Sequence, residues 1–155
     1  MKKTTTLFFL SFFIFQLNAD QVDIQADYFH ADDITKVAYF EGNAIIKQGE
    51  NEFKASKVIV FFNKKKKAVK YKAKGNVSFH LIEKGIIYEG KAGKIIYAPN
   101  DSKYHFLGDV VLNDLTNNRK IVAQSISLDL KTGLAEIKGG EKKPVHFRFE
   151  IEDRK

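Results

Sequence analysis

Apolar and polar side chains alternate with a period of two along most of the chain after residue 20. The clearest stretch runs from Val69 to Leu81, where one set of positions is apolar or small and the other set is polar. Successive side chains of a β-strand point to opposite faces, so this stretch is predicted to be a strand with one buried face and one wet face. A register shift of one residue would bury Lys70, Lys72 and Lys74, so the register is strongly specified.

The same alternation recurs nearer the C-terminus. It runs through Tyr104–Leu112, interrupted by Leu107 and Val111, and again through Val145–Ile151. After residue 20 the sequence contains no helical apolar stripe of useful length. The pattern therefore predicts an all-β protein built from antiparallel hairpins.

An internal repeat organises these strands. Three similar segments begin at Gly42, Gly75 and Gly108, which are 33 residues apart, and Gly139-Gly140 falls near the next expected position. We interpret the glycines as points where a strand bends or bulges, so that the sheet folds over on itself; alternatively, they simply begin strands. Stacked units would form a continuous apolar trough. Each glycine segment is followed by a second apolar segment (55–60, 92–97, 123–128) and then by a turn (63–65, 99–102, 131–133).

The N-terminus has the pattern of a secretory signal peptide. Met1–Lys3 is positively charged, Leu7–Phe15 is an apolar run, and a small residue, Ala19, precedes Asp20. The apolar run is shorter than the roughly 20 residues that a spanning helix needs. We expect residues 1–19 to be cleaved, leaving residues 20–155 as a single domain; the alternative is an uncleaved membrane anchor.

Composition limits the partners of such a chain. It contains no cysteine, 14 Phe and 6 Tyr, and its formal net charge is +7. An exported protein without disulfides must be held together by strand pairing and packing alone. The positive charge favours an anionic partner. Nucleic acid is not expected for an exported chain, which leaves phosphorylated lipid and anionic polysaccharide.

The sequence offers no catalytic or metal-binding motif. Its four histidines are scattered, and it has neither a Gly-x-Ser-x-Gly nucleophile motif nor a phosphate loop. We therefore expect no enzyme activity, no metal and no cofactor. The lysine run Lys64, Lys65, Lys66 and Lys67 stands where a hairpin should turn. It is either a solvated turn that discourages aggregation or a contact for phosphate.

Three segments resemble the LptA (OstA-like) family. They are Val22–Asp27, Ala38–Gly49, which contains Gly-Asn-Ala-Ile-Ile-Lys-Gln-Gly, and Ala55–Val60, which begins Ala-Ser-Lys-Val. The resemblance implies a V-shaped, twisted, open antiparallel β-jelly roll. It also implies a periplasmic carrier that passes lipopolysaccharide from an inner-membrane complex containing LptC to an outer-membrane translocon containing LptD. Members of the family stack end to end and use neither a cofactor nor catalysis.

The resemblance also suggests sites on this chain. Unpaired edges at Val22–Ala26 and Val145–Ile151 are expected to mediate head-to-tail contacts between copies. The apolar alternates are expected either to line a groove for the acyl chains of lipid A or to pack as ordinary core. They are Val22, Ile24, Phe40, Ile46, Val77, Phe79, Tyr104, Phe106 and Val110.

Three other interpretations remain open at this stage. An LptC-like, membrane-anchored member of the superfamily would keep residues 1–19. A β-sandwich hydrolase or lyase acting on anionic polysaccharide would gather carboxylates, histidine or tyrosine on a concave face. A purely structural β-scaffold would have a dry core and bind no lipid.

Overall fold

The structure, a computed structural model, describes residues 21–151. The predicted signal peptide, residues 1–19, lies outside this range, so its cleavage and the predicted boundary at residue 20 stay predictions. Within the described range, no helix combines the length and the apolar character needed to span a membrane.

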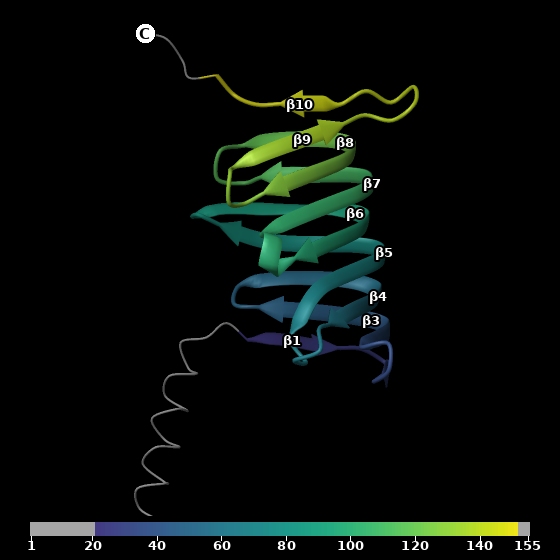
Figure 1. The fold of residues 1–155 in the computed structure, drawn as a ribbon. Helices are drawn as coiled ribbons and strands as arrows, with labels where there is room; N and C mark the ends of the chain where they lie inside the picture. Colours follow the sequence, from purple (N-terminus) through teal and green to yellow (C-terminus); the bar gives the residue numbers. More distant parts are fainter. Residues whose placement is uncertain (1–20, 152–155) are drawn as a thin grey trace, which may run out of the picture.

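Residues 21–151 form one antiparallel sheet, which confirms the all-β prediction. Its strands stack in the order β1-β3-β4-β5-β6-β7-β8-β10, while β2 also pairs with β3 and β9 also pairs with β8 (Figure 1). A short 3-10 helix, Pro99–Asp101, follows β6. The strands are β1 (Val22–Gln25), β2 (Tyr28–Asp32), β3 (Val37–Gln48), β4 (Asn51–Phe62), β5 (Ala68–Glu83), β6 (Ile86–Ala98), β7 (Lys103–Asp114), β8 (Arg119–Asp129), β9 (Leu134–Lys138) and β10 (His146–Arg148).

The repeated glycines bend the long strands, as the sequence predicts. Gly42, Gly75 and Gly108 each have φ of 85°, and the Asn or Asp that follows each of them also has a positive φ. At the first bend, Gly42 and Asn43 together lie opposite the single residue Ser56, so β3 carries a β-bulge. Positive φ favours glycine and is tolerated best by Asn and Asp, which explains the Gly-Asn and Gly-Asp pairs.

The bends divide the sheet into two arms. The β2 arm contains β2, β9 and the halves of the long strands that lie between them; the β1 arm contains β1, β10 and the other halves. In β3, for example, β2 pairs with Val37–Glu41 on one side of the bulge and β1 pairs with Ile45–Gln48 on the other. In Figure 1 the strands double back along one side of the stack, which gives the predicted V-shaped, jelly-roll architecture.

Apolar side chains fill the space between the arms. Val58, Val77, Phe106, Val110 and Ile126 are all at most 1% exposed. The alternation predicted for β5 is confirmed, because its buried side chains are Ala73, Val77, Phe79 and Leu81.

The lysine run forms the turn between β4 and β5. The side-chain oxygen of Asn63 accepts hydrogen bonds from the backbone N–H groups of Lys65 and Lys67. This local side-chain-to-backbone bonding is typical of an Asx turn, and it confirms the prediction of a turn here.

The two ends of the sheet differ from the prediction. Instead of one first strand over Val22–Ala26, β1 ends at Gln25 and a second edge strand, β2, pairs with the other half of β3. At the other end, only His146–Arg148 of the expected Val145–Ile151 strand is paired. Val145, Phe147, Phe149 and Ile151 are exposed, and no strand in the described part of the chain covers them.

Candidate functional site

The middle of the interior is closed. Six of the nine predicted groove residues are less than 9% exposed, so in this structure they pack as core: Ile46, Val77, Phe79, Tyr104, Phe106 and Val110. Ile24 and Phe40 pack against that core while staying partly exposed, and Val22 is 37% exposed. Direct contact between lipid and the buried six would require the arms to separate, so that contact stays a prediction.

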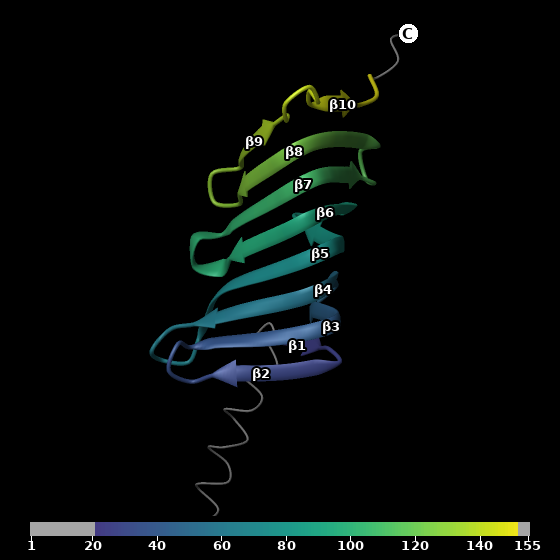
Figure 2. The same cartoon turned by 90° about the vertical axis from the view of Figure 1, so that its right-hand side faces the viewer.

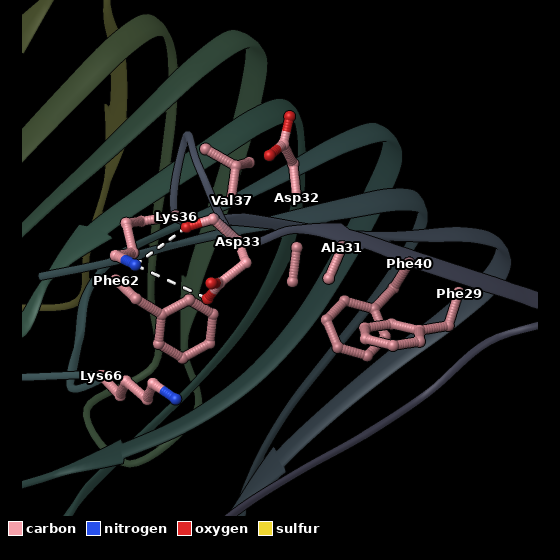
Figure 3. Close-up of a pocket in the computed structure, with 10 residues that line it drawn as sticks. Phe29, Ala31, Asp32, Asp33, Lys36, Val37, Phe40, Phe62 and Lys66 are labelled. Atoms are coloured by element: carbon pink, nitrogen blue, oxygen red, sulfur yellow. Dashed lines mark hydrogen bonds and ion pairs between the residues drawn. The ribbon is translucent and has the colours of Figure 1, made fainter. Parts of the chain in front are cut away.

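The interior opens at the N-terminal end, on the inner face of the β2 arm (Figure 3). A pocket of about 410 Å³ lies there, and its apolar surface is formed mainly by Phe29, Ala38, Phe40 and Phe62. The rings of Phe29 and Phe40 pack against each other with centroids 4.9 Å apart. Phe29 remains more than half exposed because β2 is an edge strand and nothing stacks beyond it. This surface can accept a hydrocarbon chain.

Charged side chains stand at the rim of this N-terminal pocket. The Nζ of Lys36 donates to the backbone oxygen of Asp33 at 2.8 Å and lies 3.5 Å from the carboxylate of the same residue. Lys66, from the turn between β4 and β5, lines the pocket from the other side. Of the lysine run, Lys66 is the member that lines this pocket. A phosphate contact by Lys64, Lys65, Lys66 or Lys67 stays a prediction.

A narrow apolar seam joins the arms next to this pocket. Val22, Ile46 and Phe53 from the β1 arm face Tyr71 and Tyr97 from the β2 arm around a cavity of only about 30 Å³. The rings of Tyr71 and Tyr97 stack across β5 and β6 with centroids 6.1 Å apart. The seam thus closes the interior between its two wider ends.

The interior opens again at the C-terminal end. A pocket of about 240 Å³ lies between Leu81 and Tyr88 of the β1 arm and Leu128 and Leu134 of the β2 arm. Glu83 and Asp129 both line this pocket. Partial burial raises the pKa of the Glu83 carboxyl, an effect that Lys84 partly opposes. A carboxylate in apolar surroundings is disfavoured relative to its neutral form.

Glu83→Gln is expected to raise the melting temperature at neutral pH. The folded-state pKa of Glu83 is raised, so the contribution of this carboxyl to folding stability is complete only below its unfolded-state pKa of about 4.5. That contribution is lost as the pH rises through the folded-state pKa. Glutamine removes that loss, so the gain should shrink below pH 4.5. Thermal unfolding at neutral pH and below pH 4.5 measures the change in melting temperature. An equal gain at both pH values would show that the charge of Glu83 is not responsible.

Between residues 21 and 151, no three His, Cys, Asp or Glu side chains come together in a way that could bind a metal ion. His30 and His80 bond to Glu41 and Glu89 on the outer face of the sheet. Burial raises the pKa of Tyr104 well above its usual range, so its hydroxyl stays protonated.

The one buried carboxylate in the described range has a structural role. Asp114 is 5% exposed and accepts hydrogen bonds from Asn117 and Arg119 in the turn between β7 and β8. Burial alone would raise the pKa of Asp114, but these hydrogen bonds outweigh burial and lower it. Asp114 therefore stabilises the turn as a carboxylate and is not free to act as a base.

Sequence reasoning missed the residues that open the N-terminal pocket. Phe29 and Phe62 line it, yet neither was assigned to the groove. The signal was present in the short alternation of Tyr28–Asp32, which places Phe29 and Ala31 on one face. It was weak because a strand of five residues gives only two positions on that face.

Residues 23–134 match the family described as LptA/(LptD N-terminal domain) LPS transport protein. The chain belongs to this family. It is an LptA-like member of a lipopolysaccharide transport family, as the sequence resemblance indicated. No curated protein matches it by sequence.

A solved structure supports the LptA-like fold. The crystal structure of LptH from Pseudomonas aeruginosa is described as that of the LptA homologous periplasmic component of the conserved lipopolysaccharide transport device. It matches with a TM-score of 0.71 over 84% of this chain and 96% of the LptH chain, at 13% sequence identity. At this identity the match shows a shared fold and confirms the open, antiparallel β-jelly roll.

Proposed function

We propose that the protein carries lipopolysaccharide through the periplasm and holds the acyl chains of lipid A against the inner face of its folded sheet. The main support is the apolar N-terminal pocket, which opens on the inner face of a fold shared with lipopolysaccharide transport proteins. Burying acyl carbons contributes about 0.8 kcal/mol per CH₂, so even part of a chain gives useful and reversible affinity. The proposal includes neither catalysis nor a cofactor.

The ends of the sheet suggest how copies and partners connect. Figure 2 shows β2 at one end of the stack and β9 and β10 at the other, with no strand of residues 21–151 beyond them. Unpaired N–H and C=O groups on such edges can accept a strand from another chain. We propose that β1 and β2 of one copy add to β10 and β9 of the next, and that an LptC-like partner and an LptD-like partner occupy the two ends of the bridge.

The alternatives differ in testable ways. An LptC-like, anchored protein would retain residues 1–19, which the mass of the protein isolated from cells would reveal. A polysaccharide-cleaving enzyme would need paired carboxylates that are free to react. Asp32 and Asp129, which line the two pockets, accept hydrogen bonds from the backbone of their own turns, and Asp33 lies 3.5 Å from Lys36. Glu83 is left without such a partner among the described residues of the C-terminal pocket, which argues against this alternative. A dry scaffold predicts no lipid binding.

Phe29→Glu is expected to weaken lipopolysaccharide binding about tenfold while leaving the protein folded. Burying a phenylalanine side chain against an acyl chain is worth about 1.5–3 kcal/mol when complete, and Phe29 is about half exposed before binding. The loss is measured by titrating labelled lipopolysaccharide into the purified protein.

Tyr28→Glu provides the matched control. Tyr28 is the neighbouring aromatic residue, is similarly exposed, and contacts His30 instead of the pocket. Its replacement should leave affinity unchanged. Equal losses in both variants, or no binding by the unmodified protein, would contradict the proposed carrier function.

A further inference from the structure

Four lysines share the outer face of the β2 arm. They are Lys70, Lys72 and Lys74 on β5 and Lys94 on β6. Their neighbours Tyr71, Ala73 and Ile95 face the interior, so the alternation places these four on the opposite, solvent side. We refer to these four side chains as the lysine face.

Strand register brings like charges directly opposite one another. Lys74 pairs with Lys94 across β5 and β6, and with Lys57 across β4 and β5. Directly opposed residues of an antiparallel pair have Cβ atoms roughly 5 Å apart, and like charges there destabilise the sheet. Lys57 lies 3.7 Å from the carboxylate of Glu41, whereas Lys74 and Lys94 make no ion pair within the described part of the chain.

The other two lysines extend this charge along β5. The Nζ atoms of Lys70 and Lys72 lie 4.6 and 5.7 Å from the ring centroid of Phe61 on β4. Burial lowers the pKa of Lys72, and repulsion from Lys94, Lys70 and Lys74 lowers it further. The lysines therefore act on one another electrostatically as a single cluster.

The carboxylate of Asp109 on the next strand, β7, lies 3.7 Å from Lys143, which is not one of the four lysines. Lys94 pairs with Leu107 on β7, and His105, two residues earlier on the same face, bonds to Ser127 on β8. An unneutralised cluster of this kind costs folding free energy, and an anionic partner would relieve that cost.

We propose that the lysine face binds the surface of an anionic phospholipid bilayer. The ammonium group of lysine is a compact point charge and lacks the planar, two-pronged geometry of the arginine side chain. It is therefore better suited to a surface of many phosphate groups in varied positions than to a single carboxylate held in fixed geometry. The aromatic ring of Phe61 lies among the ammonium groups, as expected for contact with an interface. Lysines near an anionic membrane contribute to binding roughly additively.

This surface is separate from the acyl-chain pocket. The lysine face is on the outer side of the β2 arm, whereas Phe29, Phe40 and Phe62 line the inner side. The inference therefore does not rest on the proposed carrier function. A molecule bound in this way would lie with β4–β6 against the membrane and with both sheet edges free.

Co-sedimentation with lipid vesicles tests the proposal. The protein should bind vesicles of phosphatidylcholine containing phosphatidylglycerol and not vesicles of phosphatidylcholine alone. Binding should weaken as salt rises, because the Debye length falls from about 8 Å at 0.15 M to about 3 Å at 1 M. The triple variant Lys72→Gln, Lys74→Gln, Lys94→Gln should bind anionic vesicles at least about tenfold more weakly.

A second triple variant controls for total charge. Lys64→Gln, Lys65→Gln, Lys67→Gln removes the same charge from the turn and should retain most of the binding. Phe29→Glu should also retain it, which separates this proposal from the carrier function. Circular dichroism checks folding, which should not suffer because the first triple variant removes repulsion.

Three results would overturn the proposal. One is equal loss in the two triple variants, which would mean that total charge alone attracts the protein. Another is no binding of the unmodified protein to anionic vesicles. The third is retention on immobilised polyglutamate without any vesicle binding, which would indicate an acidic protein as the partner.

Discussion

Gly90→Ala is expected to lower the free energy of unfolding by about 3 kcal/mol. A Cβ atom at Gly90 would overlap the backbone oxygen of Val111 on β7 and would lie 2.9 Å from Cζ of Phe79 on β5. A side chain can rotate away, but the backbone oxygen cannot move without parting β6 from β7. Overpacking in a core typically costs about 1–3 kcal/mol, and a clash with backbone belongs at the upper end. Denaturation by urea, followed by circular dichroism, measures the change.

Gly93→Ala is the matched control within β6. The closest atom to a Cβ at Gly93 is the backbone oxygen of Leu107, at 3.3 Å, which a small local shift relieves. We expect its stability to stay within about 1 kcal/mol of the unmodified protein. A Gly90→Ala variant as stable as this control would mean that β6 and β7 are not packed as described.

The double substitution Phe147→Asp, Phe149→Asp is expected to weaken head-to-tail association on the order of a thousandfold. Phe147 pairs with Ile121, whose side chain packs against the core, so the apolar inner face continues to the C-terminal edge. Both phenylalanines are about half exposed, and their rings contact each other edge to face. Central aromatic residues commonly contribute about 2 kcal/mol or more each to an interface. Sedimentation velocity over a range of protein concentrations measures the association.

Leu115→Asp is the control for this interface. Leu115 is 52% exposed in the turn between β7 and β8, and its backbone N–H donates a hydrogen bond to the carbonyl oxygen of Ile87 on β6. Its replacement removes an exposed apolar side chain without touching the edge, so association should persist. A protein that stays monomeric at every concentration, or equal losses in the control and the double variant, would rule out stacking through this edge.

The repeat and the strand faces could be predicted because they depend on local chemistry. Gly42, Gly75 and Gly108 stand where φ must be positive, which is a property of the backbone that sequence reveals. The lysines of β5 fix which of its faces is outside, since burying them without partners is costly. Leu107 and Val111, which break the alternation of β7, lie on its outer face.

The N-terminal pocket could not be predicted because its shape depends on how segments that are distant in the sequence pack against one another. In β4 the buried positions change from Ala55 to Val58 and Val60, because two residues instead of one separate Ala55 from Val58 at the bend, where the pairing with β3 and β5 shifts register. A strict period of two therefore assigns part of β4 to the wrong face. Whether an inner residue is core or groove depends on the separation of the arms, which no local pattern encodes.

The 33-residue repeat makes the length of the molecule adjustable in fixed steps. Each repeat supplies two long strands, and neighbouring strands are about 4.8 Å apart, so one repeat adds about 10 Å to the stack. Because a strand contacts little beyond its immediate neighbours, a unit such as residues 42–74 could be duplicated or removed without redesigning the others. Gain or loss of whole repeats would therefore change the length of the stack in steps of about 10 Å while leaving each strand pairing intact.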